Sequence, residues 1–137
     1  MVDRDLVSRR RLALEQYLRE LREVIAVGRD SYLADWKAQR AAERSLHLAM
    51  EVCLDLAEHV IADQRLQAPE TAAGMFDTLR DAGLIEPVLA AALSRMARFR
   101  NLLVHDYVRI DASRVFDIAA NDVADMEAFS EVVNQLI

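Results

Sequence analysis

Hydrophobic residues recur along most of the chain three or four positions apart, which is the spacing of an α-helix. This period predicts a first amphipathic helix over about residues 3–27, with Gly28 as its carboxyl-terminal cap. A second long helix is expected over about residues 37–63. One of its faces is apolar, and the opposite face carries charged side chains, namely Arg40, Arg44, Glu51, Asp55 and Glu58.

Two further helices are predicted in the middle of the chain. Pro69 suits the first turn of a short helix over about residues 70–81, and Gly83 suits its end. A third long helix is expected over about residues 84–103, because the apolar residues there keep the helical period: Ile85, Val88, Leu89, Ala92, Leu93, Met96 and Phe99.

A last helical region is expected over residues 115–136. Either Asp111 or Ser113 can cap its start, and Asn121 with Asp122 is a candidate kink. Together these segments predict an all-α fold, an up-down bundle of four to five helices.

The composition fits one helical domain over residues 1–137. Hydrophobic residues make up 53% of the chain, and only three glycines and two prolines interrupt it. Charged residues occupy the start of the chain, where a signal peptide would be apolar, and no run approaches the roughly 18 apolar residues of a membrane span. We therefore expect a cytoplasmic protein with no membrane partner. The single cysteine, Cys53, lies among apolar residues and is expected to be buried.

The net charge of −6 argues against a protein that coats nucleic acid nonspecifically. The charge is unevenly distributed, however. Residues 95–114 contain five arginines and only two aspartates, whereas the residues that follow are acidic without a base. An acidic protein therefore carries one locally basic segment.

This basic segment contains an unusual polar pattern, RFRNLLVHDYVRI, with Arg100, Asn101, His105 and Tyr107 at close spacing. On a continuous helix Arg100 and His105 would project about 140° apart. They converge only if the helix ends near residue 103 or 104 and the following residues are extended, since alternate side chains then share one side. We expect this arrangement, with an arginine, a histidine and a tyrosine lining one polar cleft.

An arginine and a histidine are sufficient for RNA cleavage without a metal. The histidine can move protons on or off the attacking 2′-hydroxyl or the leaving 5′-oxygen. The arginine can hold the phosphate and stabilise the charge that develops on it. The sequence shows no HExxH, no DxD and no Cys/His ligand spacing, so neither a metal nor another cofactor is expected.

The pattern resembles the Arg-polar-x-x-x-His-x-Tyr motif of HEPN-domain proteins, specifically the HepT-type toxins. The similarity extends from about residue 40 to the carboxyl terminus, through RAAERSLHLAMEVCLDLAEHVIA, TAAGMFDTLRDAGLI and LSRMARFRNLLVHDYVRIDASRVFDIA. It implies a HEPN bundle that forms a homodimer, with the two motifs meeting at the interface in a composite ribonuclease site. It also implies a partner, an MntA-like minimal nucleotidyltransferase antitoxin that transfers AMP from ATP to the motif tyrosine.

Carried onto this chain, the resemblance makes Arg100 and His105 the catalytic pair, Asn101 a supporting residue, and Tyr107 the residue that receives AMP. An AMP group two residues from His105 would compete with RNA phosphate for Arg100. Dimerisation would also double the local positive charge around one cleft.

Other residues near the motif have open roles. Asp106 either orients His105 or caps the following turn. Arg95, Arg98 and Arg109 are candidates for contacts to RNA phosphates, because they supply planar cationic groups in the same basic segment.

Several features also have structural explanations. His47 and His59 are too far apart along one helix to share a metal and are interpreted as structural. Tyr32 and Trp36 either stack on a base or, in the favoured interpretation, make core or dimer contacts.

The chain as a whole has an alternative function, that of a non-catalytic nucleotide- or phosphate-binding partner of a nucleotidyltransferase. A purely structural bundle would leave the polar motif unexplained.

Overall fold

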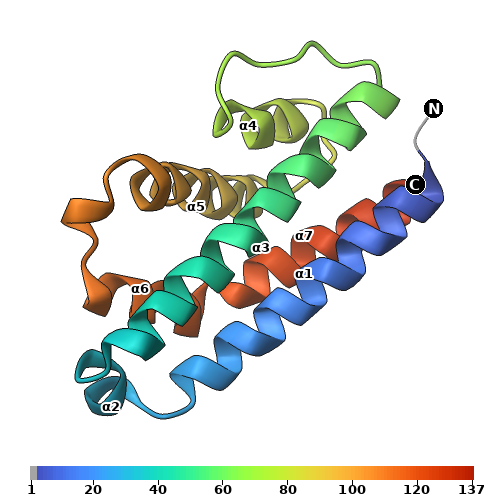
Figure 1. Cartoon of the computed structure of the whole chain (residues 1–137). Helices are drawn as coiled ribbons and strands as arrows, with labels where there is room; N and C mark the ends of the chain where they lie inside the picture. The colour runs from blue at the N-terminus through green and yellow to red at the C-terminus, as the bar shows by residue number, and fades with distance from the viewer. Residues whose placement is uncertain (1–2) are drawn as a thin grey trace.

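The computed structural model describes residues 3–137, and the regular structure within that range is helical (Figure 1). No helix in that part of the chain is both long and apolar enough to cross a membrane. In chain order the elements are α1 (Arg4–Ile25), α2 (Arg29–Leu33), α3 (Trp36–Asp63), α4 (Gly74–Asp81), α5 (Pro87–His105), a 3₁₀ turn η1 (Tyr107–Arg109), α6 (Ala112–Asn121) and α7 (Val123–Leu136).

The predicted all-helical class and the long helices are confirmed, but residues 3–137 form seven α-helices rather than the expected four to five. One extra helix is α2, which forms where only a short turn was expected. Gly28, with a φ of 92°, lets the chain reverse direction between α1 and α2. The other arises because the last helical region is divided at Asp122, the candidate kink, whose own N–H still bonds to Ile118 of α6.

The start of α4 was predicted wrongly. The helix begins at Gly74 rather than at residue 70, and Pro69 lies before it rather than in its first turn. A side chain replaces helical bonding here, since the Gly74 N–H donates to Thr71 Oγ1 at 3.1 Å. In contrast, Asp111 caps α6 as one of the two predicted alternatives, accepting a hydrogen bond from the Ser113 N–H at 3.0 Å.

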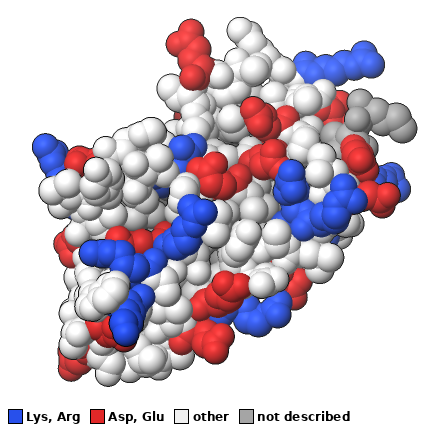
Figure 2. Space-filling model, viewed as in Figure 1, with Lys and Arg blue, Asp and Glu red and all other residues white. Residues whose placement is uncertain are grey.

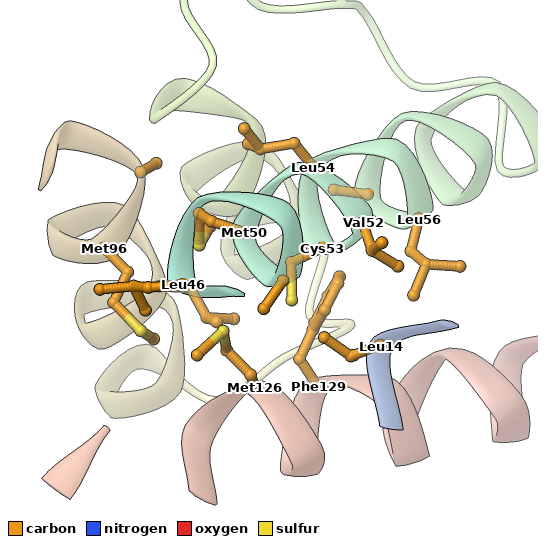
Figure 3. Close-up of a cluster of buried hydrophobic side chains, with 14 of the residues drawn as sticks. Leu14, Leu46, Met50, Val52, Cys53, Leu54, Leu56, Met96, Met126 and Phe129 are labelled. Atoms are coloured by element: carbon orange, nitrogen blue, oxygen red, sulfur yellow. The ribbon is translucent and has the colours of Figure 1, made fainter. Parts of the chain in front are cut away.

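The central element is α3, which packs against each of the other six α-helices. Figure 1 shows it crossing the molecule between α5 on one side and α1 with α7 on the other. Its buried residues meet side chains from α1, α5 and α7 in one cluster, which Figure 3 shows around Met50 and Cys53. Cys53 is fully buried, as predicted.

Two aromatic pairs tie the short helices α2 and α4 to the core. Tyr32 of α2 is fully buried against Phe116 of α6, with ring centroids 5.3 Å apart. Phe76 of α4 meets Phe129 of α7 edge to face at 5.4 Å. The short helices α2 and α4 are therefore held by the same core as the long ones.

Replacing Phe129 with alanine should lower the free energy of unfolding by about 3–5 kcal/mol, because the ring is fully buried and leaves a cavity. Urea denaturation followed by circular dichroism measures this change. Val88→Ala is the matched control, since Val88 is 84% exposed and its truncation should change stability by less than about 0.5 kcal/mol. A Phe129→Ala variant as stable as this control would contradict the described core.

Candidate functional site

The polar motif lies at the end of α5, but the helix is longer there than predicted. It runs through His105, and the Asp106 N–H donates to the Leu102 carbonyl at 2.9 Å. The backbone then tightens into the 3₁₀ turn, in which the Arg109 N–H donates to the Asp106 carbonyl at 3.0 Å. The predicted helix end near residue 103 or 104, and the extended segment after it, are therefore wrong.

The longer helix changes how the motif side chains are arranged. Arg100 and His105 lie on one continuous helix and so project about 140° apart. Arg100 is partly buried toward α3, whereas His105 is exposed. One chain alone therefore does not bring arginine, histidine and tyrosine into the single cleft that the sequence predicted.

Arg100 is held against α3 by a carboxylate. Its side chain is only 17% exposed, and its Nε lies 3.0 Å from Glu51 Oε1. The Nε–H is not aligned with that oxygen and has no hydrogen-bond partner among residues 3–137. The contact is thus an ion pair that leaves donor capacity of the guanidinium unused.

Glu51 also joins Arg100 to a second polar group on α3. His47 Nε2 lies 3.4 Å from the same Glu51 oxygen, and His47 Nδ1 lies 3.1 Å from Arg44 Nη1. A guanidinium only donates hydrogen bonds, so in this geometry Nδ1 is the acceptor and Nε2 carries the proton that faces Glu51. Arg44, His47, Glu51 and Arg100 therefore form one continuous polar chain.

Tyr107 lines a groove of about 300 Å³ at the start of this chain. One wall comes from α3 and the other from the end of α5 and the residues after it, with Arg40, Glu43, Arg44 and His47 facing Leu103, Tyr107 and Ile110. Figure 2 shows Lys and Arg side chains gathered over this amino-terminal half of α3. The tyrosine of the motif thus lies beside a basic surface supplied by a different helix.

The α3 residues of this site share one face of the helix. Arg40, Arg44, His47 and Glu51 follow one another by four, three and four positions, which places them within about 60° around the helix axis. Sequence reasoning interpreted the charged residues as a solvated face and His47 as structural. The sequence held one signal of a site on α3, namely a histidine within this polar stripe. Nothing in the stripe, however, indicates that the Arg100–Tyr107 motif packs beside α3.

The other predicted site residues surround the end of α5. Asn101, His105 and Arg98 are exposed. The Asp106 carboxylate lies 3.4 Å from Arg109 Nε, which favours the interpretation that Asp106 stabilises the following turn. Burial and, secondarily, Asp125 raise the pKa of Asp122, and Arg95 opposes them, so Arg95 acts on a region away from the end of α5.

The aromatic residues at the start of α3 have separate positions. Tyr32 is a core residue, as the favoured interpretation held, and its hydroxyl has no hydrogen-bond partner within the described residues. Burial and, secondarily, Glu43 raise the pKa of Tyr32 to about 12, while Arg40 opposes them. Trp36 is 65% exposed, with Lys37 Nζ 5.9 Å from the ring centroid. Only Trp36 of the two is accessible to a ligand.

The arrangement offers guanidinium groups, imidazoles and a phenol. Burial raises the pKa of the Cys53 thiol to about 12, so this cysteine supplies no thiolate nucleophile. No group of three or more His, Cys, Asp or Glu side chains in residues 3–137 is arranged to hold a metal ion. The chemistry that these side chains can perform is proton transfer and stabilisation of negative charge.

Comparison with known proteins identifies the family. A family model described as "Ribonuclease HepT-like" matches residues 14–133. The chain belongs to this HepT-like family. It is 25% identical over 129 residues to the mRNA nuclease HepT of Shewanella oneidensis, covering 94% of this chain and 96% of that protein. It is 27% identical over 111 residues to the tRNA nuclease HepT of Aphanizomenon flos-aquae, covering 81% and 76%.

Solved structures share the HepT-like fold. The tri-AMPylated HEPN toxin of Shewanella oneidensis, solved in complex with MNT antitoxin, matches with a TM-score of 0.90 at 24% identity, covering 97% of this chain and 99% of that chain. YutE from Bacillus subtilis, a cytosolic protein of unknown function, matches with a TM-score of 0.83 at 19% identity, covering 98% and 90%. The bundle is therefore a HEPN-like fold.

Tyr107 should be the first tyrosine that tetranitromethane nitrates at mildly alkaline pH. The reagent needs access and a phenolate. Tyr107 is 71% exposed, whereas Tyr17 is half-buried and Tyr32 is fully buried, with its pKa raised to about 12. Peptide mass spectrometry over a time course measures the order of reaction. Nitration of Tyr32 as fast as Tyr107 in the folded protein would show that the described burial is wrong, and the urea-unfolded chain is the control in which the difference disappears.

Proposed function

We propose that this protein is a ribonuclease toxin that cleaves RNA without a metal and is silenced by a nucleotidyltransferase antitoxin. The observation that carries the proposal is the Arg100-x₄-His105-x-Tyr107 pattern in a HepT-like chain, at an exposed helix end beside a basic groove. The names of two relatives, an mRNA nuclease and a tRNA nuclease, support the reaction class.

In the proposed reaction His105 removes the proton from a 2′-hydroxyl of the RNA, and the 2′-oxygen attacks the adjacent phosphorus. The bond from phosphorus to the 5′-oxygen breaks, and that oxygen takes up a proton from water. Arg100 stabilises the extra negative charge on the phosphate, with Asn101 as a supporting polar group. This step needs the 2′-hydroxyl of RNA, so DNA would not be a substrate.

The active form is proposed to be a homodimer. Arg100 and His105 diverge on one helix, whereas a second copy would place the arginine of one chain and the histidine of the other on one phosphate. Arg98 and Arg109, both exposed, are the neighbouring residues proposed to contact RNA phosphates, and Arg95 is proposed as a weaker contributor.

The proposed antitoxin is an MntA-like nucleotidyltransferase that modifies Tyr107. A HEPN toxin of the same fold has been solved in tri-AMPylated form with MNT antitoxin. The Tyr107 hydroxyl would attack the α-phosphorus of ATP and release pyrophosphate, leaving AMP on the tyrosine oxygen. The new anion would lie two residues from His105 and compete with RNA for the arginines.

The second candidate is a phosphate- or nucleotide-binding partner of a nucleotidyltransferase without ribonuclease activity. The polar chain from Arg44 to Arg100 favours this candidate as much as it favours the ribonuclease, because its donors can bind a phosphate whether or not that phosphate reacts. Only a measurement of cleavage separates the two functions.

The protein expressed without its partner should cleave labelled single-stranded RNA in excess EDTA, and His105→Ala should reduce the rate about 10²–10⁴-fold through loss of proton transfer. His59→Ala is the matched control, because His59 lies on α3 beside Asp55 and outside the motif. Cleavage that persists in His105→Ala would remove His105 from the chemistry. A folded parent that cleaves no RNA would favour the binding partner.

Tyr107→Phe should block AMP transfer from labelled ATP by the cognate nucleotidyltransferase, because it removes the accepting oxygen, and the variant should remain active as a ribonuclease in its presence. Tyr17→Phe is the control and should be modified like the parent. Incorporation of label into Tyr107→Phe at the parental level, measured by intact mass, would assign the modification to another residue.

A further inference from the structure

The groove beside Tyr107 has features of an anion-binding site that the ribonuclease mechanism does not use. Its α3 wall presents two guanidinium groups one turn apart, with His47 after them on the same face; the Glu43 carboxylate also lines this wall and is paired with Arg40. At about 300 Å³ it lies at the lower limit of small-molecule pockets, about 300–1,000 Å³. The space suits one nucleotide rather than a large ligand.

The two arginines of this wall have donors to spare. Arg40 Nη1 is 2.6 Å from Glu43 Oε2, but the Arg40 side chain is 64% exposed and can turn toward the groove. Arg44 donates to His47 through one Nη only. The contact with His47 does not use its other N–H donors. Planar guanidinium groups bind phosphate oxygens in pairs, so two of them one turn apart suit a phosphodiester.

The position of Tyr107 decides which phosphodiester reaches the wall. The tyrosine lines the same groove, so a phosphate bonded to its oxygen begins within reach of the opposite side chains. From His47, which lines the groove, polar contacts continue through Glu51 to Arg100, which the proposed mechanism places on the RNA phosphate. One basic wall therefore adjoins both the modified residue and the scissile phosphate.

We propose that Arg40, Arg44 and His47 form a phosphodiester-binding subsite next to Tyr107. It holds a flanking phosphate of the RNA strand in the unmodified protein and the phosphate of AMP after Tyr107 is modified. This inference rests on the proposed function, since it adds a substrate and modification subsite to that site. AMP on Tyr107 then blocks RNA by occupying the subsite as well as by its bulk.

The first arm of the test measures binding of a fluorescent 2′-O-methyl oligoribonucleotide, which cannot be cleaved because its 2′-oxygen is blocked. Arg40→Gln/Arg44→Gln should weaken binding about tenfold for each arginine and reduce the slope of log Kd against log salt by about 0.7 for each lost contact. The control Arg9→Gln/Arg19→Gln removes the same charge from exposed positions on α1 outside the groove. It should leave binding close to that of the parent.

The second arm measures how fast a phosphodiesterase removes AMP from modified Tyr107. A phosphate held by the arginines is protected, so removal should be several-fold faster from Arg40→Gln/Arg44→Gln than from the parent or the α1 control. Loss of RNA affinity alone assigns the subsite to the RNA strand, and faster removal alone assigns it to AMP. Thermal unfolding monitored by circular dichroism shows whether each variant is folded. If the double variant is not folded, the single variant Arg44→Gln replaces it.

The subsite is overturned if the arginine variants match the α1 control in both arms. That outcome is distinct from failure of the proposed function, which would appear as a parent that cleaves no RNA although it binds the uncleavable oligonucleotide. It is also distinct from a misassigned modification, in which AMP is found on a residue other than Tyr107.

Discussion

The structure depends on one long helix that is apolar on most of its circumference and polar along a single stripe. The apolar part of α3 packs against the other six described α-helices, so burial of this surface is the main source of the bundle's stability. The polar stripe is left at the surface between α1 and α5 and cannot be covered without a compensating charge. Glu51 meets this requirement by pairing with Arg100, and that pairing fixes where the motif arginine lies.

The proposed homodimer depends on the geometry at the end of α5. Because α5 continues through His105, the arginine faces α3 and the histidine faces away from it. The 3₁₀ turn that follows brings Tyr107 back beside the basic wall of α3 and leaves Val108 exposed. The proposed dimer brings together an arginine and a histidine that one helix holds apart. The proposed AMP group would occupy the groove beside Tyr107, which the single chain already forms.

The sequence was sufficient to predict the helical class, the long helices and the polar motif, because each depends on local periodicity or on nearby residues. The end of α5 was not predictable from these rules, since no glycine or proline marks it and the last turn is retained by the bond from Asp106 to Leu102. The start of α4 depends on a single hydroxyl contact from Thr71. The α3 side of the site was missed because Glu51 and Arg100 are far apart in sequence and only tertiary packing brings them together.

The most direct measurement is RNA cleavage by heterodimers of Arg100→Ala and His105→Ala chains, purified by two different tags. Each homodimer lacks one essential group, but a heterodimer retains one arginine and one histidine on different chains. If the site is shared between two copies, the heterodimer should recover a substantial part of the parental activity. A heterodimer that forms, stays folded and remains as inactive as both parent homodimers would contradict a site in which the arginine of one chain acts with the histidine of the other.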